Sequence, residues 1–321
     1  MINLDLLLAE VNTVAISGHI RPDGDCVGSC LATYNYIKTY YPKIQVDLYL
    51  EPIPEVFHFL HGSGEIKSDR NADICYDLFI SQDCGDPDRL GASLKYFETA
   101  FHTINIDHHI SNTGFGEYNY VMPKASSASE LIFNILPKDK ITKEIAECIY
   151  TGIVHDTGVF QYSCTSKSTM EIAGFLMDFG IDYPKIVDET FFVKTFEQNK
   201  ILGVALLKSQ LHLDGTCIST IITKDDMKTC HVTANELEGI ASKLRSTQGV
   251  ETALFLYETE EDYKVSFRSA KYVDVSAIAV KYGGGGHIRA AGCNIKGNPE
   301  EIVKKLVQEV KNEGMRHREN C

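Results

Sequence analysis

The stretch Phe101-His102-Thr103-Ile104-Asn105-Ile106-Asp107-His108-His109 joins a short apolar run to a polar end. Ile104 and Ile106 share one side of the run, which predicts a buried strand over residues 101–106. A turn follows at Ser111-Asn112. Neutral imidazole and carboxylate are ligands that divalent transition metals accept. The stretch therefore predicts a strand that ends at three residues of metal-ligand type, Asp107, His108 and His109.

A second strand with a polar end is predicted nearer the start of the chain. Residues 14–17 form a compact predicted strand, and the following loop holds His19, Asp23 and Asp25 before a helical pattern begins. In α/β sheets, ligands bind beyond the carboxyl ends of the strands. A solvated turn with a capping aspartate is the simpler alternative. That alternative explains one aspartate and leaves His19 and the other carboxylate without a role.

Two further acidic residues follow apolar segments. Residues 78–81 read as a buried strand that ends at Asp83, and Asp156 follows a helix predicted from about residue 142. A lone aspartate at such a place is usually a cap, but three strand ends in turn offer a ligand. Strands that alternate with helices indicate an α/β fold, with a doubly wound, mostly parallel sheet in the N-terminal domain.

The composition of the chain changes after about residue 185. We predict an N-terminal α/β domain over residues 1–185, a partly helical connector over 186–202, a smaller α/β domain over 203–315 and a frayed tail over 316–321. In the smaller domain we expect strands over 217–222, 253–258 and 263–269, and helices over 236–244 and 299–311. A cleft between the two domains is the expected place for a substrate.

The charge balance restricts the class of partner. The 321 residues carry a formal net charge of -13, and such a surface repels long polyanions. We expect no long duplex nucleic acid and no membrane as a partner, since no apolar run is long enough to cross a bilayer. Ten cysteines without a CxxC pair and no visible signal peptide indicate the cytoplasm. Cys26 and Cys30 lie at helical spacing, and burial as small side chains is their favoured interpretation.

The polar residues at the strand and helix ends form one candidate metal centre. Two histidines and four aspartates suffice for two divalent ions that share a bridging carboxylate, and without cations the carboxylates would repel one another. Mixed nitrogen and oxygen ligation suits Mn²⁺, with Co²⁺, Fe²⁺, Zn²⁺ or Mg²⁺ as alternatives. Two-metal sites support phosphoester hydrolysis. The six candidate ligands are His19, Asp23, Asp25, Asp83, His108 and Asp156.

The smaller domain holds a second group of candidate residues. Arg268 and Ser269 end a predicted strand, and four glycines, residues 283–286, precede His287. Consecutive glycines let backbone N–H groups approach an anion closely. A flexible hinge explains the glycines alone equally well. Together with Arg268 and His287, they predict a pocket for a phosphate group.

These motifs, taken in order, resemble the DHH phosphoesterase superfamily, which includes RecJ-like enzymes, in the subfamily with a C-terminal DHH-associated domain. The resemblance covers nearly the whole chain, and each motif is weak alone whereas the ordered set is specific. The group that it resembles most is that of stand-alone nano-RNases that also act as pAp phosphatases. The motifs are His19-x-x-x-Asp23-x-Asp25, Asp83, Asp107-His108-His109, Asp156, Arg268-Ser269 and Gly284-Gly285-Gly286-His287.

The resemblance implies a role for each matching residue. His19, Asp23 and Asp83 would hold one Mn²⁺, and Asp25, Asp83, His108 and Asp156 would hold the other, so that Asp83 bridges. Asp107 would orient a histidine, and His109 would face the scissile phosphate as stabiliser or proton donor. The residues that would grip the terminal nucleotide are Arg268, Ser269, Gly285, Gly286 and His287. His155 departs from the family pattern, and we assign it a surface position without a role.

The activity implied by this resemblance is Mn²⁺-dependent hydrolysis of very short oligoribonucleotides and of pAp. A phosphodiesterase for cyclic or linear dinucleotides such as c-di-AMP or pApA is an alternative with the same site. A catalytically silent nucleotide-binding regulatory module is an alternative of another class. A long-strand exonuclease and an inorganic pyrophosphatase are less favoured, because the chain lacks room for strand-guiding domains and because Arg268 favours an organic phosphate. The resemblance also allows a homodimer.

Overall fold

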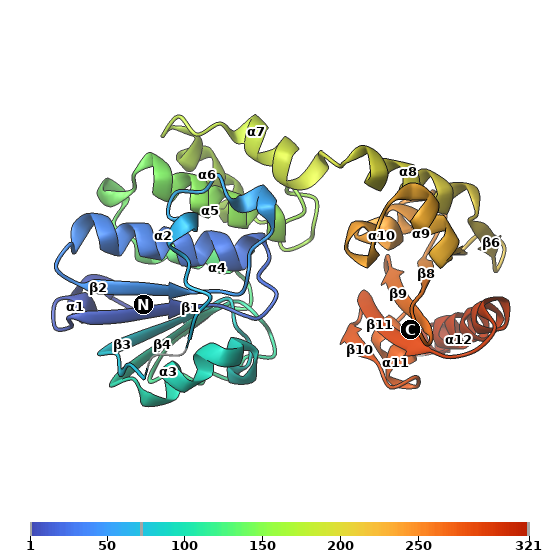
Figure 1. Ribbon diagram of the computed structural model, residues 1–321, viewed down its shortest axis with the longest axis horizontal. Coiled ribbons are helices and arrows are strands. Elements are labelled where there is room, and N and C mark those ends of the chain that lie inside the picture. Colours follow the sequence, from blue (N-terminus) through green and yellow to red (C-terminus); the bar gives the residue numbers. More distant parts are fainter. Residues whose placement is uncertain (1, 71–72, 320–321) are drawn as a thin grey trace. The chain divides into compact units, whose positions relative to one another are not determined.

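The computed structural model describes residues 2–70 and 73–319, and the chain divides into two compact units, residues 1–193 and 194–321 (Figure 1). Residues 186–202, predicted as a connector, belong partly to each unit. They include the end of α7 (Tyr183–Val187), a π-helical turn (Asp188–Phe192) and the start of α8 (Phe196–Leu207). Each unit has its own sheet and its own buried cores.

The first unit contains a five-stranded sheet in which every neighbouring pair is parallel. The strand order is β2-β1-β3-β4-β5, which confirms the predicted doubly wound parallel sheet. The edge strand β5 was not predicted, because its half-exposed residues do not form an apolar run. The strands are β1 (Thr13–Ser17), β2 (Gln45–Tyr49), β3 (Leu78–Gln82), β4 (His102–Asp107) and β5 (Tyr118–Val121).

Helices cover both faces of this sheet (Figure 1). On one face of the sheet, valine and isoleucine side chains pack against the larger group of helices. On the other face, Phe79 and its neighbours pack against Leu90 and Tyr96, which belong to the segment that includes α3 (Leu94–Thr99). Burial of both faces explains why the central strands read as continuous apolar runs. The helices on the first face are α1 (Leu4–Leu8), α2 (Gly24–Tyr40), α4 (Ala128–Ile135), α5 (Lys143–Asp156) and α6 (Lys167–Met177).

The strand order reverses between β1 and β3, which are neighbours in the sheet. In doubly wound sheets this reversal leaves a crevice at the carboxyl ends of the two strands, where ligands bind. His19 follows β1 and Asp83 follows β3. The topology therefore brings two of the predicted ligands to the same edge of the sheet.

The second unit contains a six-stranded mixed sheet in the order β10-β11-β9-β8-β7-β6, in which β7 and β8 are parallel and the other pairs are antiparallel. Helices α8, α9 (Lys224–Cys230) and α10 (Ile240–Arg245) cover one face, and α11 (Val275–Val280) and α12 (Pro299–Glu319) cover the other (Figure 1). The strands are β6 (Gln210–His212), β7 (Cys217–Ile222), β8 (Thr252–Glu258), β9 (Tyr263–Ser269), β10 (Gly285–His287) and β11 (Ala290–Ile295).

One prediction about local structure is corrected. Residues 316–319 of the predicted frayed tail are helical, since α12 continues as far as Glu319, and residues 320 and 321 lie outside the described part. Within the glycine run, Gly285 and Gly286 belong to β10 and pair with β11. Across residues 2–70 and 73–319, no helix combines the length and apolar character needed to span a membrane. The nine cysteines in these ranges are free thiols.

Candidate functional site

Asp83 lies at the centre of the candidate metal site. Its carboxylate is 2% exposed, with Oδ2 3.5 Å from His19 Nε2 and Oδ1 3.5 Å from His108 Nε2. The backbone of Asp83 is left-handed, with φ at 50°, and its N–H donates to the Ile106 carbonyl at 3.0 Å. A left-handed backbone is costly for residues other than glycine and concentrates at functional sites. The strained turn after β3 thus places one carboxylate between two imidazoles.

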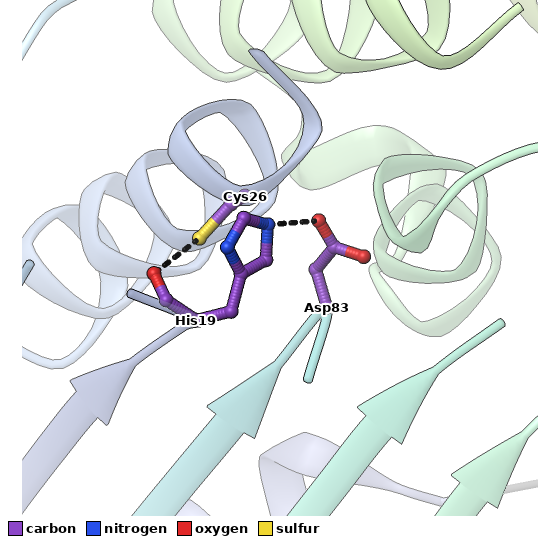
Figure 2. Close-up of side chains that lie close together, drawn as sticks. All are labelled: His19, Cys26 and Asp83. Carbon is purple, nitrogen blue, oxygen red and sulfur yellow. Dashed lines mark hydrogen bonds and ion pairs between the residues drawn. The ribbon is translucent and has the colours of Figure 1, made fainter. Parts of the chain in front are cut away.

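His19 approaches Asp83 from the loop between β1 and α2 (Figure 2), and Asp23 lies in the same loop. His19 Nδ1–H donates to the Ile20 carbonyl at 2.8 Å, which leaves Nε2 as the nitrogen that faces Asp83. Asp23 is the N-cap of α2, and its Oδ1 accepts from the N–H groups of Asp25 and Cys26. Its other oxygen lies 3.7 Å from His19 Nε2. Capping therefore fixes the side chain of Asp23 beside His19.

His108 gathers the second group of carboxylates. Its Nε2 lies 3.2 Å from Asp156 Oδ2 and 3.9 Å from Asp25 Oδ2, in addition to its contact with Asp83. Asp156 is the last residue of α5, not a residue beyond the helix as the sequence predicted. A residue in the last turn of a helix is held by the helix itself. Residues from four separate segments thus meet around His108 and Asp83.

Asp25 is fixed by the N-terminus of another helix. Its Oδ2 accepts from the backbone N–H of Ala128 at 2.6 Å, and its Oδ1 accepts from that of Ser129 at 2.9 Å. Both donors lie in the first turn of α4, where unpaired N–H groups and the helix dipole favour a negative charge. Asp25 is 1% exposed. The chain thus holds this buried carboxylate in one orientation before any ligand arrives.

The electrostatics of the cluster fit divalent cations. Asp83 Oδ1 is buried and accepts no hydrogen bond, which is costly unless a cation or donor completes the site. Burial and the neighbouring carboxylates raise the pKa of Asp25 to about 7 and that of Asp156 to about 8. Although burial opposes charge on the imidazoles, adjacent aspartates raise the pKa of His19 to about 12 and that of His108 to about 10. Both effects reveal excess negative charge that metal ions would neutralise.

The potential ligand atoms form three overlapping groups, and in each group they lie within 4.8 Å of one another. Asp83 belongs to two of the groups, as does His108. Nitrogen and oxygen donors in these proportions suit Mn²⁺ and related ions. The groups are His19, Cys26 and Asp83, then Asp83, His108 and His109, then Asp25, His108 and Asp156. The burial predicted for Cys26 and Cys30 is confirmed, but the nearness of Cys26 to the ligands was not foreseen.

Asp107 contacts the second histidine of the Asp-His-His motif. It is fully buried, and its Oδ1 accepts from His109 Nδ1–H at 2.7 Å. Asn112 donates to its other oxygen at 2.6 Å. This arrangement leaves His109 Nε2 available to a ligand, and the Asp107 bond raises the pKa of His109. The sequence predicted only a turn at Asn112. Its contact with Asp107 was not predicted, because a polar residue in a turn does not indicate which side chain it contacts.

His155 does not occupy the surface position that we predicted. Its ring is half-buried between Phe57 and Phe191, with ring centroids 4.9 and 5.8 Å away. Thr190 donates its hydroxyl to the Ile186 carbonyl, so His155 Nε2–H donates to Thr190 Oγ1 at 2.8 Å. His155 therefore ties the end of α5 to the π-helical turn. Its apolar neighbours come from segments distant in sequence, which is why the sequence did not reveal its burial.

In the second unit, the strand register places Arg268 and His287 on one face of the sheet. Arg268 pairs with Ala290, and Ala290 pairs with His287. Directly opposed residues of antiparallel strands project to the same side. The small Ala290 therefore lies between two basic side chains. The neighbouring set of paired residues on the same face consists of Gly285, Gly292 and Ser266. Small residues leave this part of the face open between the arginine and the histidine.

Ser269 lies on the opposite side of β9 from Arg268. It is 7% exposed, and its hydroxyl donates to Glu251 Oε1 at 3.0 Å. Glu251 also accepts from the backbone N–H groups of residues 271–273, and Arg289 Nη1 lies 3.4 Å from Ser269 Oγ. Ser269 thus helps to hold the loop after β9. The roles of Glu251 and Arg289 were not visible in the sequence.

Comparisons with known proteins agree with this architecture. The model of the DHH family N-terminal domain matches residues 13–153, and the model of the DHHA1 domain matches residues 221–313. A bifunctional oligoribonuclease and PAP phosphatase NrnA of Thermus thermophilus is 26% identical over 313 residues, which cover 96% of this chain and 92% of that protein. The protein of the same name from Bacillus subtilis is 27% identical and covers 88% of this chain and 90% of its own length.

Solved structures show the same fold. An exopolyphosphatase-related protein from Bacteroides fragilis superposes with a TM-score of 0.90 at 25% identity, over 98% of this chain and 96% of that one. The exonuclease RecJ bound to manganese has a TM-score of 0.51 at 13% identity, over 97% of this chain and 91% of its own, and this likeness concerns the fold alone. Both domain models match in order, and the two named relatives have a similar length, so the chain contains a DHH family N-terminal domain followed by a DHHA1 domain.

Proposed function

We propose that the protein removes mononucleotides from very short oligoribonucleotides and dephosphorylates pAp. The single observation that carries the proposal is the buried Asp83 carboxylate between His19 and His108, because its Oδ1 accepts no hydrogen bond and a cation at the edge of the sheet would satisfy it. Relatives named oligoribonuclease and PAP phosphatase match nearly the whole chain, which supports this choice of substrate. The net charge of -13 favours short substrates over long ones.

We infer that the site binds two Mn²⁺ ions, with Asp83 as the bridge. His19 and Asp23 would complete one half of the site, while Asp25, His108 and Asp156 would complete the other. The distances from the two imidazoles to Asp83 support this division. The nitrogen and oxygen donors of the site support Mn²⁺ as the metal. Free thiols at the described cysteines support a cytoplasmic location.

The chain's own residues would position and protonate the substrate. When bound, the two ions supply positive charge that activates water and offsets the charge of the phosphate. His109 Nε2–H would donate a proton to the leaving oxygen, since Asp107 holds the ring by Nδ1 and stabilises its protonated form. Asn112 keeps Asp107 in place. Asp107 is then a positioning residue, and His109 is the acid.

The basic row of the second unit, which consists of Arg268 and His287, would bind a phosphate group. Arg268 and His287 project from the same face, and the backbone at Gly285 and Gly286 is free of side chains. Arginine binds phosphate through charged hydrogen bonds, and glycine permits close approach of the backbone. Ser269 would act indirectly, through Glu251 and the loop after β9. These residues provide positive charge in a chain that is acidic overall.

A panel of substrates tests the proposal. The full-length protein with Mn²⁺ is incubated separately with RNA of two to five nucleotides, pAp, pApA and c-di-AMP, and the loss of each substrate and the release of mononucleotide and phosphate are measured. Turnover of short RNA and pAp is expected, and the absence of release from all four refutes it. Faster turnover of c-di-AMP than of pApA would favour the cyclic dinucleotide alternative. Fewer than two bound ions per chain would favour a regulatory module.

A further inference from the structure

The thiol of Cys26 lies beside the His19 half of the metal site. Cys26 is in the first turn of α2 and is fully buried. Its Sγ lies within 4.8 Å of the ligand atoms of His19 and Asp83, which are themselves within that distance of each other. Figure 2 shows the three side chains together beyond the ends of the strands. A sulfur atom is therefore within reach of an ion held by the imidazole and the carboxylate.

The backbone around Cys26 keeps the sulfur at this position. A Cβ atom on Gly18 would lie 2.2 Å from Cys26 Sγ, so the glycine leaves the space that the sulfur occupies. The Cys26 N–H donates to Asp23 Oδ1 at 3.2 Å, which links the cysteine to the cap that also fixes Asp23. The nearest hydrogen bond of the thiol, to the His19 carbonyl, is long at 3.9 Å. The sulfur is thus held in place without a strong hydrogen bond.

The Asp83 carboxylate of this group is buried, and its Oδ2 lies 3.5 Å from His19 Nε2. Its Oδ1, which has no hydrogen-bond partner, lies on the other side, 3.5 Å from His108 Nε2. Imidazole, carboxylate and thiolate together form a ligand set that suits Zn²⁺ and Co²⁺, whereas Mn²⁺ prefers oxygen and nitrogen. The position of Cys26 therefore adds a soft donor to one half of a site whose other ligands are harder.

We propose that Cys26 is a ligand for thiophilic divalent cations, so that Zn²⁺ or Co²⁺ binds this half of the site through a metal–sulfur bond. On binding, the S–H bond breaks, the metal–sulfur bond forms and the proton passes to water, with no change of oxidation state. A Zn²⁺ ion bound in this way uses a ligand that Mn²⁺ does not need. Zn²⁺ would then displace Mn²⁺ from the His19 half of the site. The proposal rests on the metal centre of the proposed function and not on catalysis.

Cobalt spectroscopy tests the proposal independently of activity. Metal-free, full-length protein receives one equivalent of Co²⁺, and the expected result is a thiolate-to-cobalt charge-transfer band in the near-ultraviolet. Cys26→Ser should lack the band. Cys30→Ser is the matched control, since Cys30 is fully buried one turn further along the same helix, and it should keep the band. A wild-type protein without the band, or a Cys26→Ser protein that retains it, overturns the proposal.

Zinc binding provides a second measurement. X-ray absorption of wild-type protein with one equivalent of Zn²⁺ should show a sulfur neighbour at about 2.3 Å. In Cys26→Ala, Zn²⁺ affinity should fall about tenfold or more, while Mn²⁺ affinity stays unchanged. A zinc shell of nitrogen and oxygen alone, or an equal loss of affinity for both metals, contradicts the proposal. Metal–sulfur bonding in a protein that hydrolyses none of the four substrates would refute the proposed function and leave this inference standing.

Discussion

Asp25 Oδ1 accepts a hydrogen bond of 2.9 Å from the backbone N–H of Ser129, a residue 104 positions further along the chain. This bond joins the first turn of α2 to the first turn of α4. Gly152 of α5 lies against the same pair, because a Cβ there would be 1.9 Å from Ser129 Oγ and 2.8 Å from Asp25 Oδ1. Three helices therefore determine where one candidate ligand lies.

Gly152→Ala should lower both stability and metal affinity. The added methyl group would push Ser129 and Asp25 from their places, and overpacking of this kind costs about 1–3 kcal/mol. Urea unfolding and Mn²⁺ titration measure the two effects. Gly174→Ala in α6 is the matched control, since its Cβ would meet nothing within 4 Å. That helical substitution should leave metal affinity unchanged and raise stability slightly. Equal changes in stability and in Mn²⁺ affinity for the two variants would contradict the role of Gly152.

Asp83→Asn should reduce the hydrolysis rate at least about a hundredfold, because one amide replaces the carboxylate shared by both halves of the site. Asparagine tolerates the left-handed backbone at this position, so the change isolates the charge. Rates and bound metal per chain are measured together. Asp88→Asn alters an exposed carboxylate nearby and serves as the control. A near-normal rate in Asp83→Asn would exclude the bridging role.

Added Mn²⁺ should raise Tm more at a pH of about 9 than at about 6. Burial and nearby carboxylates raise the pKa of Asp25 to about 7 and that of Asp156 to about 8, from an ordinary value of 3.8. A raised pKa stabilises the metal-free fold below the ordinary value, and this stabilisation is lost as pH rises through about 7 to 8. At pH 6 the metal must displace these protons. Calorimetry with and without Mn²⁺ measures the shift, and equal shifts at both pH values would refute the linkage.

Asp107→Asn should move the alkaline limb of the rate profile to lower pH. The Asp107 hydrogen bond raises the pKa of His109, and the protonated ring is the proposed acid. Without the Asp107 carboxylate the pKa of His109 falls, so the protonated, active form of His109 is lost at a lower pH. Substitutions of this kind cost about 10- to 100-fold in rate. The profile of kcat against pH at saturating Mn²⁺ measures the change, and a uniform loss without a shifted limb would indicate a purely structural role.

His287→Ala should raise KM for short RNA and leave the metal content intact. The histidine lies in the second unit, whereas the candidate metal ligands lie in the first. His231→Asn, an exposed substitution at the end of α9 with a left-handed backbone, is a suitable control. Steady-state kinetics and metal analysis of both variants provide the comparison. Loss of bound metal in His287→Ala would show that the assignment of the basic row is wrong.

Local patterns predicted the central strands and the longer helices, because burial on both faces produces continuous apolar runs. Strand β4 and helix α2 were found in this way. The edge strands β5 and β10 were not predicted, because an edge strand with few buried side chains has no continuous apolar run. Tyr118 and the glycines at 285 and 286 become strand residues only because a neighbouring strand pairs with them. Pairing of that kind depends on contacts between distant segments.

The sequence alone determined which residue types follow the strands of the first unit and therefore which chemistry the strand ends offer. Parallel strands bring their carboxyl ends to one edge, so His19, Asp83 and His108 had to approach one another. Only the tertiary structure decided that α4 fixes Asp25, that Asp107 holds His109 and that the Cys26 sulfur lies beside the metal ligands. These relationships depend on helix packing and side-chain orientation at distances of a few ångströms, which no local pattern encodes.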